Sequence, residues 1–406
     1  MQEVCPEVRR IAPREHKGRT GASMMGSSDG QKNIFHTVQL EDLVPDDHPL
    51  RRIRPLVDTA RIRELCADFY CADNGRPSIP PEQIFLAMLG GYLLGCRSDR
   101  NIIRQLTCDM ALRWFVGLDI DSPVWDASTF SKNRENRFDD SGIFEKLFDD
   151  TVMHAKSKGW VSMHWSVDGT LVRANASLKS LAHIEVYQSP EQYRETISGK
   201  EKTAEKAKTD DDDKGNPGVG WHGEKRSNAT HRSTTDPDSR LATKSNKTAA
   251  VPSYVVNGTM ENRNRILTGI GVELFTGKAE RDGAVALLDR AKSRYKLSPS
   301  SLGGDKGYFV KAFAQDLLDR KIAPHLAAME TGRDKALMRV RMRCRGLGYQ
   351  LSQRARKKIE ELWGEGKELH GLRRFARRQL ENVRQEAFMI GWVLNLKRIA
   401  TLQAAV

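Results

Sequence analysis

The chain has 406 residues, which is enough for about two or three domains with a sizeable hydrophobic core. Its 66 Lys and Arg against 53 Asp and Glu give a formal net charge of +13, which favours a polyanionic partner and disfavours a cationic one. The excess is local, because residues 331–406 contain 18 Lys and Arg but 7 Asp and Glu. We therefore expect a nucleic-acid-binding face in the last fifth of the chain.

Export and membrane insertion are not expected. The first residues include arginine pairs but no apolar stretch, so no signal peptide is predicted. The longest apolar run, Ile84–Cys96, is too short to span a bilayer, so no membrane partner is expected. The six cysteines lack the spacing of a zinc site, and reduced thiols of a cytoplasmic protein are the simplest interpretation.

Residues 1–34 are polar, basic and rich in Gly and Ser, and we predict a disordered segment there. Met24 and Met25 stand just before the first patterned sequence, so translation from one of them is a hypothesis.

Residues 35–155 have a helical pattern and are predicted to form an N-terminal domain of short helices. Asp126 can cap the last helix of this pattern, whose surface is rich in Lys, Arg and Asn. Such an arrangement resembles a helix-turn-helix DNA reader, with Lys132, Arg134 and Arg137 as candidate DNA contacts. The alternative is a helical bundle with a hydrophilic surface.

The sequence then changes to alternation at residues 163–170, where Trp165 and Val167 alternate with Ser166 and Asp168. This pattern predicts a strand that ends at Asp168, just before Gly169. A carboxylate at a strand end is a frequent place for chemistry in α/β sheets, and it is also an ordinary strand-ending residue.

Residues 185–250 break the pattern and are predicted to be a polar insertion outside the core. Strands are expected at 252–258, 266–275, 301–308 and 322–327, and the third of these contains Asp305. Helices are expected around Ala284–Ala291 and at 311–319. Adjacent early strands followed by strand–helix alternation predict a mixed α/β sheet flanked by helices over residues 156–406.

A further helix is predicted at 352–367, and the chain closes with a long helix at 375–401. In the first of these, Ile359, Leu362 and Trp363 form one apolar stripe. Glu360 lies on another face with Arg356 four residues before it and Lys367 seven residues after it. The two cations either contact phosphates or form salt bridges with Glu360 on the helix surface.

Three carboxylates therefore stand out: Asp168, Asp305 and Glu360. Clustered carboxylates repel one another unless cations neutralise them, and Mg²⁺ prefers such oxygen ligands. Two ions about 4 Å apart can serve phosphodiester chemistry, because one activates the attacking hydroxyl and the other stabilises the leaving oxygen.

This pattern resembles the DDE transposases of bacterial insertion sequences, in the insertion-sequence-five type related to the type-four group. VDGTLVRANAS (167–177) resembles the segment around the family's first Asp, and GDKGY (304–308) that around its second. Arg356-x3-Glu360-x6-Lys367 resembles the family's Tyr-x2-Arg-x3-Glu-x6-Lys signature, with Gln353 in place of the Tyr. STTDPDSRL and the closing helix are also similar to family segments.

The resemblance implies a ribonuclease H-like catalytic domain at 156–406 and an enzyme that binds terminal inverted repeats. It would hydrolyse the phosphodiester at each end and join the freed 3′-hydroxyl to target DNA. Asp168, Asp305 and Glu360 would be the ligands of two Mg²⁺ ions, with Mn²⁺ as a substitute. The residues implied in DNA or phosphate binding are Arg356, Lys367, Lys132, Arg134, Arg137, Arg373 and Arg374.

Further expectations follow from the task of joining two DNA ends, which needs at least a dimer on double-stranded DNA. The expected location is the cytoplasm, in the bacterial nucleoid. Two alternatives stay open at this point: a metal-dependent nuclease of the same fold, and a DNA-binding protein without catalysis.

Overall fold

The computed structural model describes residues 39–71, 78–138, 141–184, 226–243, 248–332 and 334–404. Residues 1–34 with the two candidate start methionines, and most of the predicted insertion at 185–250, lie outside the described residues. Residues Leu40–Val406 form one compact unit, so the predicted domain boundary near 155 stays a prediction.

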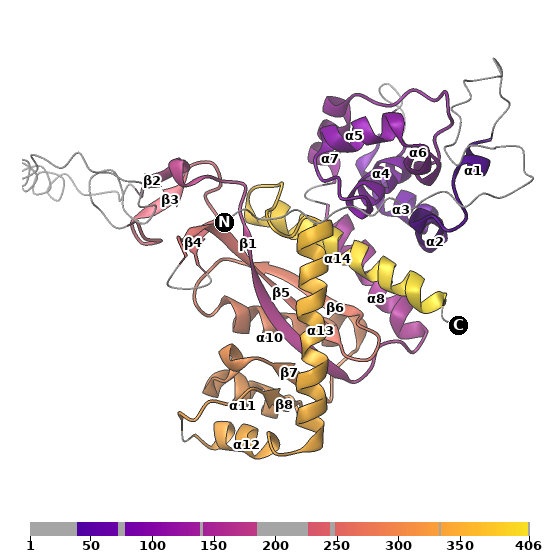
Figure 1. The fold of residues 1–406 in the computed structure, drawn as a ribbon. Coiled ribbons are helices and arrows are strands. Elements are labelled where there is room, and N and C mark those ends of the chain that lie inside the picture. Colours follow the sequence, from indigo (N-terminus) through magenta and orange to yellow (C-terminus); the bar gives the residue numbers. More distant parts are fainter. Residues whose placement is uncertain are drawn as a thin grey trace, which may run out of the picture. The chain divides into compact units, whose positions relative to one another are not determined.

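The first part of the chain is helical, as predicted (Figure 1). Side chains begin several of these helices: Ser98, Asp109 and Asp126 each accept a hydrogen bond from a backbone N–H in the first turn. The α-helices are α1 (Leu40–Leu43), α2 (Pro49–Ile53), α3 (Thr59–Cys66), α4 (Pro81–Leu93), α5 (Asp99–Cys108), α6 (Met110–Val116), α7 (Ala127–Arg137) and α8 (Ile143–Ser157).

A mixed sheet follows, in which β6, β5 and β1 are antiparallel neighbours and β7 and β8 continue parallel to β1. This order and these directions are those of the expected ribonuclease H-like fold, which is confirmed. β4 pairs with the other end of β5, and β2 pairs with β3 in a separate hairpin. The strands are β1 (His164–Arg173), β2 (Leu181–His183), β3 (His231–Ser233), β4 (Arg240–Ala242), β5 (Val251–Glu261), β6 (Leu267–Glu273), β7 (Ser301–Gly304) and β8 (Ala323–Leu326).

Helices cover both faces of this sheet. On one face, Trp363 of α13 lies against Gly258 of β5, because a Cβ at that glycine would meet the indole Cζ2 at 2.5 Å. On the opposite face, Asn257 Nδ2 donates to the carbonyl of Ala279 in α10 at 3.0 Å. The helices after β6 are α10 (Ala279–Tyr295), α11 (Lys311–Asp319), α12 (Lys335–Arg343), α13 (Leu347–Leu369) and α14 (Leu380–Gln403).

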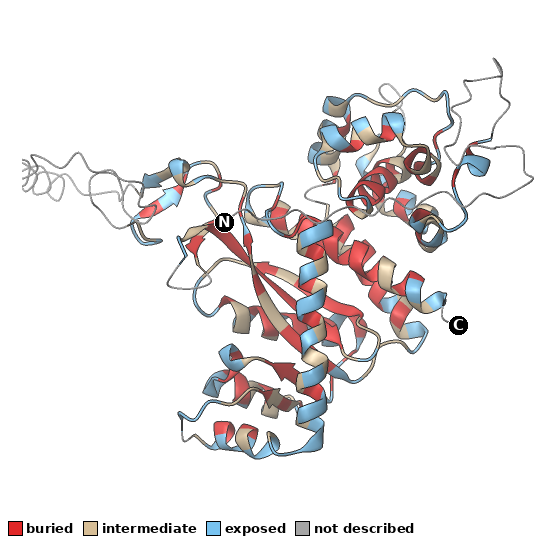
Figure 2. Cartoon of the chain, viewed as in Figure 1, coloured by how far each residue is buried: buried red, intermediate tan, exposed pale blue. Residues whose placement is uncertain are grey.

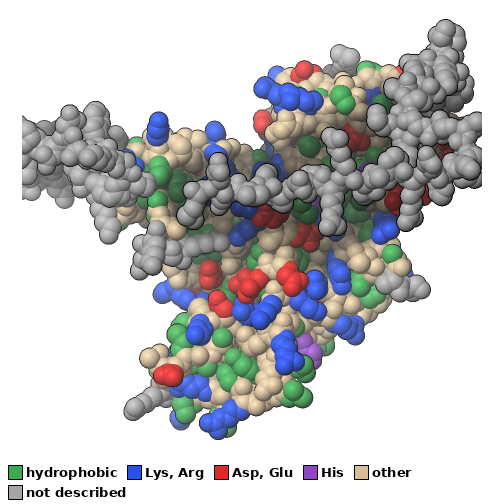
Figure 3. All heavy atoms as spheres, viewed as in Figure 1, with side chains coloured by type: hydrophobic (Ala, Val, Ile, Leu, Met, Phe, Trp, Pro, Cys, Tyr) green, Lys and Arg blue, Asp and Glu red, His purple; other side chains and the backbone are tan. Residues whose placement is uncertain are grey.

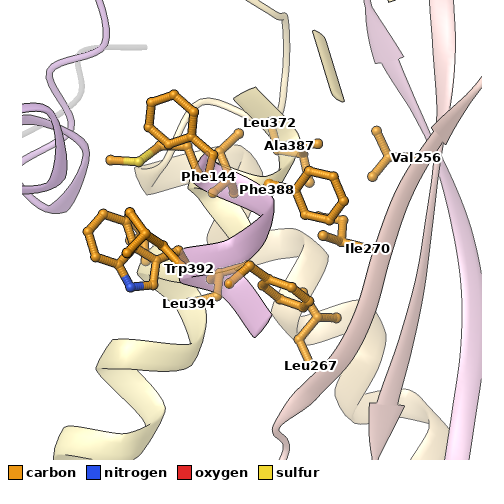
Figure 4. Packing of buried hydrophobic residues seen from close by; sticks show 14 of the residues in the cluster. Phe144, Val256, Leu267, Ile270, Leu372, Ala387, Phe388, Trp392 and Leu394 are labelled. Atoms are coloured by element: carbon orange, nitrogen blue, oxygen red, sulfur yellow. The ribbon is translucent and has the colours of Figure 1, made fainter. Parts of the chain in front are cut away.

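The main core lies between the sheet and α14, with α8 packed behind (Figures 2 and 4). Phe388 of α14 lies near Ile270 of β6, its ring centroid is 5.8 Å from that of Phe148 of α8, and all three side chains are buried. Asn395 adds a polar connection, since its side chain accepts from Leu267 N at 2.9 Å and donates to Leu267 O at 3.0 Å. α14 is therefore buried nearly all round, as expected for a helix between two layers.

Several predicted elements differ from those observed. Asp168 is not at a strand end, because β1 continues to Arg173 as the antiparallel partner of β5. The closing helix begins at Leu380 and not at 375, because residues 373–375 pair with the end of β1 instead. α12 was not predicted, although Asp334 caps it by accepting from Ala336 N at 3.0 Å.

The predicted insertion is not wholly outside the core. β4 belongs to the main sheet, and Asp236 beside it is fully buried. Its carboxylate accepts from the Tyr254 hydroxyl at 2.7 Å and from Gln379 N at 3.0 Å, while Asp238 accepts from Leu380 N at 2.9 Å. The segment STTDPDSRL thus connects β4 to the start of α14, which gives this family-like segment a physical role.

The other global expectations concern cysteines and membranes. Cys66, Cys71, Cys96, Cys108 and Cys344, which are the cysteines among the described residues, are all unpaired thiols. No helix within the described ranges is long and apolar enough to cross a membrane.

The contact between α13 and the sheet gives a first prediction. Gly258→Ala places a methyl group into the Trp363 ring, so α13 must shift, and we expect a loss of about 1–3 kcal/mol in the free energy of unfolding. The matched control is Gly364→Ala on α13 itself, where no atom lies within 4 Å of an added Cβ. That change should be neutral or stabilising by up to about 1 kcal/mol. Denaturant unfolding of both variants decides, and equal stabilities would contradict the packing described.

Candidate active site

Asp168 lies on β1, and Asp305 directly follows β7, the parallel neighbour of β1. In the register of β1 and β7, Ser166 pairs with Gly303, and each aspartate follows two residues later. Because side chains alternate along a strand, both carboxylates point to the face of Ser166 and Gly303. That face is the one covered by α13, since a Cβ at Gly303 would meet Ser352 Oγ at 2.8 Å.

The charge on this pair is poorly neutralised. Burial and, after it, the neighbouring Asp305 carboxylate raise the pKa of Asp168 to about 7. Arg356 acts in the opposite direction, while Glu360 and Glu280 add to the negative field. Asp305 is also a helix cap: its Oδ1 accepts from Gly307 N at 2.8 Å. Two adjacent carboxylates of this kind form a site with affinity for a cation.

Glu360 lies on α13 above this face, as the helix prediction required, but its side chain is 54% exposed. Its Oε1 accepts from Arg356 Nη1 at 2.8 Å, so the structure contains the salt bridge, the second of the two arrangements left open for Arg356. Gly364, one turn further, has no atom within 4 Å of an added Cβ, so this side of α13 is open.

Gln353, which stands where the family signature has Tyr, connects α13 to the strand ends. Its Nε2 donates to the carbonyls of Gly304 at 3.2 Å and His325 at 2.6 Å. Gly304 directly precedes Asp305, so this side chain fixes the distance between α13 and the second aspartate. The departure from the signature therefore keeps a positioning contact.

A basic pocket lies further along β1. Lys367 donates to Thr170 Oγ1, and Arg373 and Arg374 reach the same region because their segment pairs with the end of β1. The pairing consists of Arg173 N to Arg373 O at 3.2 Å and Phe375 N to Arg173 O at 2.9 Å. These basic residues line a pocket of about 420 Å³. Three of the predicted phosphate contacts therefore converge.

The predicted DNA contacts of α7 are in three different situations. Lys132 is exposed. The side chain of Arg134 is 12% exposed and pairs with Asp99 of α5 at 3.0 Å. Arg137 donates to Ser78 Oγ at 2.7 Å and its guanidinium lies over the Tyr70 ring. Lys132 thus has the surface position expected of a DNA contact, while Arg134 and Arg137 also hold the fold together.

The fit of this site to Mg²⁺ depends on Asp168 and Asp305. Among the described residues no three His, Cys, Asp or Glu side chains are arranged to hold one metal ion, so Glu360 does not converge with the aspartates here. Mg²⁺, however, is commonly held by one or two carboxylates and keeps several waters. The adjacent, under-neutralised Asp168 and Asp305 match that chemistry. On the face drawn in Figure 3, acidic side chains gather with Lys and Arg side chains around them.

Sequence reasoning missed two residues near the aspartates, Glu280 in the first turn of α10 and Tyr308 after β7. Glu280 belongs to no alternating or helical pattern that singles it out. Its only signal is its place, an acid at the start of the helix that follows three sheet strands. Tyr308 was noticed only as part of GDKGY.

Comparisons with known proteins are consistent with these features. A family model described as a transposase domain matches residues 38–136, and one described as a transposase DDE domain matches residues 229–396. The second segment contains Asp305 and Glu360, and Asp168 lies outside both segments. No curated protein matches this chain. A cryo-EM structure of a piggyBac transposase synaptic complex with hairpin DNA has a TM-score of 0.36 and 9% identity, covering 88% of this chain and 75% of that one.

The raised pKa of Asp168 gives a prediction about stability. Its pKa of about 7 in the folded state exceeds the ordinary 3.8, so ionised Asp168 opposes folding, increasingly as the pH rises through that interval. Asp168→Asn should therefore stabilise the metal-free protein by about 2 kcal/mol above pH 7 and have no effect below about pH 4.

The measurement is chemical denaturation at several pH values in the presence of a chelator. Asp289→Asn is the control of opposite sign, because a hydrogen bond from Arg320 lowers the pKa of Asp289. A destabilised Asp168→Asn variant at pH 8 would contradict the electrostatics described here.

Proposed function

We propose that this chain, which contains a transposase domain and a transposase DDE domain by the family models it matches, is an insertion-sequence transposase of the insertion-sequence-five type. It binds the terminal inverted repeats of its element as double-stranded DNA. It then cleaves the ends and joins them to target DNA in Mg²⁺-dependent steps, in the bacterial nucleoid. The observation that supports the proposal is the register of β1 and β7, in which Asp168 and Asp305 each follow the last pair, Ser166 with Gly303, by two residues.

Asp168 and Asp305 hold Mg²⁺, with Glu360 as the third ligand and Mn²⁺ as a substitute. Mg²⁺ bound by these carboxylates would supply Lewis-acid activation of the scissile phosphate and of the attacking hydroxyl group. The chain's own part is positional: parallel pairing fixes the two aspartates, and Gln353 and Trp363 fix α13 above them. Arg356 holds Glu360 in the free protein and releases it to contact a phosphate of the bound DNA.

The DNA follows the basic residues. Arg373, Arg374 and Lys367 bind the phosphates next to the cleaved bond, since their pocket adjoins the same strand as Asp168. Lys132, Arg134 and Arg137 on α7 belong to the surface that binds the inverted repeat. Because two ends must be joined, the active form is at least a dimer assembled on DNA.

The test is cleavage of a labelled duplex that carries the element's own end, with Mg²⁺ or Mn²⁺. The wild type should cut at the repeat terminus, and Asp168→Ala, Asp305→Ala and Glu360→Ala should each reduce the rate at least about a hundredfold. Glu361→Ala is the matched control on α13, because Glu361 pairs with Arg265 at 3.0 Å and lies about 100° around the helix from Glu360.

Each other outcome overturns a distinct part of the proposal. A duplex that is bound but never cut favours a DNA-binding protein without catalysis. Cutting that ignores the repeat favours a general metal-dependent nuclease. Cutting that survives in Glu360→Ala, while both aspartate variants are dead, removes Glu360 from the site.

Lys132 is exposed and Arg134 is paired with Asp99, so their effects on DNA binding and on stability should be separable. Lys132→Ala should weaken duplex binding at all sequences, lower the slope of log affinity against log salt by about 1, and leave the melting temperature unchanged. Arg134→Ala should lower the melting temperature, because it leaves Asp99 without its 3.0 Å partner. Fluorescence anisotropy and thermal unfolding measure the two effects. Unchanged binding by Lys132→Ala would remove this face of α7 from the DNA interface.

A further inference from the structure

Glu280 approaches the aspartates from the opposite face of the sheet. It lies in the first turn of α10 and its side chain rests on Gly169, the residue after Asp168. A Cβ at Gly169 would meet Glu280 Cγ at 2.6 Å and Cδ at 3.0 Å. Any side chain at position 169 would displace this carboxylate. Gly169, which has no side chain, leaves the room in which Glu280 packs against β1.

Two buried polar groups without hydrogen-bond partners lie on the same face. The Asn257 side chain is 0% exposed, and its Oδ1 lies 3.1 Å from the position of a Cβ on Gly169. The Tyr308 side chain is 1% exposed and rests on Gly304, where an added Cβ would meet Tyr308 Cβ at 3.3 Å. A buried hydroxyl or amide oxygen without a partner is costly, so these groups indicate space for a ligand with hydrogen-bonding atoms.

The carboxylates of the candidate site contribute to the pKa values of Tyr308 and Glu280, so both groups lie near the aspartates. Burial raises the pKa of Tyr308, and the carboxylates of Glu280, Asp168 and Asp305 raise it further in that order. Burial and then Asp305 raise the pKa of Glu280. Three carboxylates from two faces of the sheet therefore act on one buried hydroxyl.

Next to Asp168 and Gly169, one edge of β1 has no strand partner among the described residues. On the β7 side, β1 is paired up to Ser166 and then not again until Arg173, within the part of the chain that the structure describes. Asp168 and Gly169 lie in that unpaired interval, directly beyond the end of β7. Glu280 rests on Gly169 at this uncovered edge, so it contacts β1 one residue along the strand from Asp168.

No other interaction explains the position of Glu280. Among the salt bridges of the described residues, none involves it, and its neighbour Arg281 is bound to backbone carbonyls instead. The guanidinium of Arg281 donates to Gly307 O at 3.1 Å and to Gly277 O at 2.9 Å. A carboxylate that is partly buried, close to other carboxylates and without a salt bridge is destabilising, and such groups concentrate at functional sites.

We infer that Glu280 is a fourth carboxylate of the active site, admitted by Gly169, and that the Tyr308 hydroxyl is a positioning group that hydrogen-bonds to the ligands of the bound cations. This inference rests on the proposed function, because it adds residues to the same Mg²⁺ site. Four carboxylates balance the charge of two divalent ions, whereas three leave a positive excess.

The experiment measures binding of Mn²⁺ alone to the full chain by electron paramagnetic resonance, together with thermal unfolding in chelator. Glu280→Gln should weaken Mn²⁺ binding about tenfold, and Tyr308→Phe should weaken it by a smaller factor in the same direction. Tyr308→Phe should also have an equal or higher melting temperature, because it deletes a hydroxyl that has no partner in the metal-free fold. Glu273→Gln is the matched control, since Glu273 is a half-exposed glutamate of β6 near Arg384.

Three results would overturn the inference. Glu280→Gln with wild-type Mn²⁺ affinity removes it from the site, and a lower melting temperature alone would show that it serves only the start of α10. Tyr308→Phe that is stabilised with unchanged affinity removes the positioning role. Equal weakening by Glu273→Gln would mean that any lost acid has this effect. Asp168→Ala separates the two claims: if it binds Mn²⁺ and cuts DNA normally, the proposed function fails as well.

Discussion

The pairing of β1 with β7 is the constraint on which the candidate site depends. Three residue pairs join these parallel strands, and the last of them, Ser166 with Gly303, decides that both aspartates appear at one level on one face. A shift of one residue would turn one carboxylate to the α10 side, where Glu280 and Tyr308 lie. The two small residues of the last pair also allow α13 to approach closely, so the same contact positions Glu360.

The site opposes the stability of the fold, because its groups repel one another in the absence of a cation. Burial and like charge work in the same direction at Asp168, and the nearest guanidinium, that of Arg356, is shared with Glu360. The rest of the fold offsets this electrostatic destabilisation, because α14 packs between the sheet and α8 with large apolar side chains. This division between a strained edge and a well-packed core is usual where function requires charges to be held together.

Much of the architecture could be predicted from sequence because the signals were local. Alternation located β1, the capping residue Asp126 located α7, and the apolar stripe of Ile359 and Trp363 located α13. What failed was non-local. Residues 373–375 look like the start of a helix, but pairing with β1 competes successfully for their backbone groups. β4 joins the sheet although its neighbourhood is polar, because Asp236 is satisfied by Tyr254 and Gln379 from distant segments. Glu280 could not be found, since nothing in its own neighbourhood shows that Gly169 leaves room for it.

The β2–β3 hairpin has a consequence for engineering. His183 pairs with His231, and Ile184 N donates to Thr230 O at 2.9 Å. The β2–β3 pairing therefore holds the two ends of the intervening segment close together. Closing a longer loop on such a pairing costs only about 0.6 kcal/mol for each doubling of its length. The chain between these strands is thus a natural position for accommodating a foreign module, such as a fluorescent reporter or a second DNA-reading domain, while the catalytic sheet keeps its register.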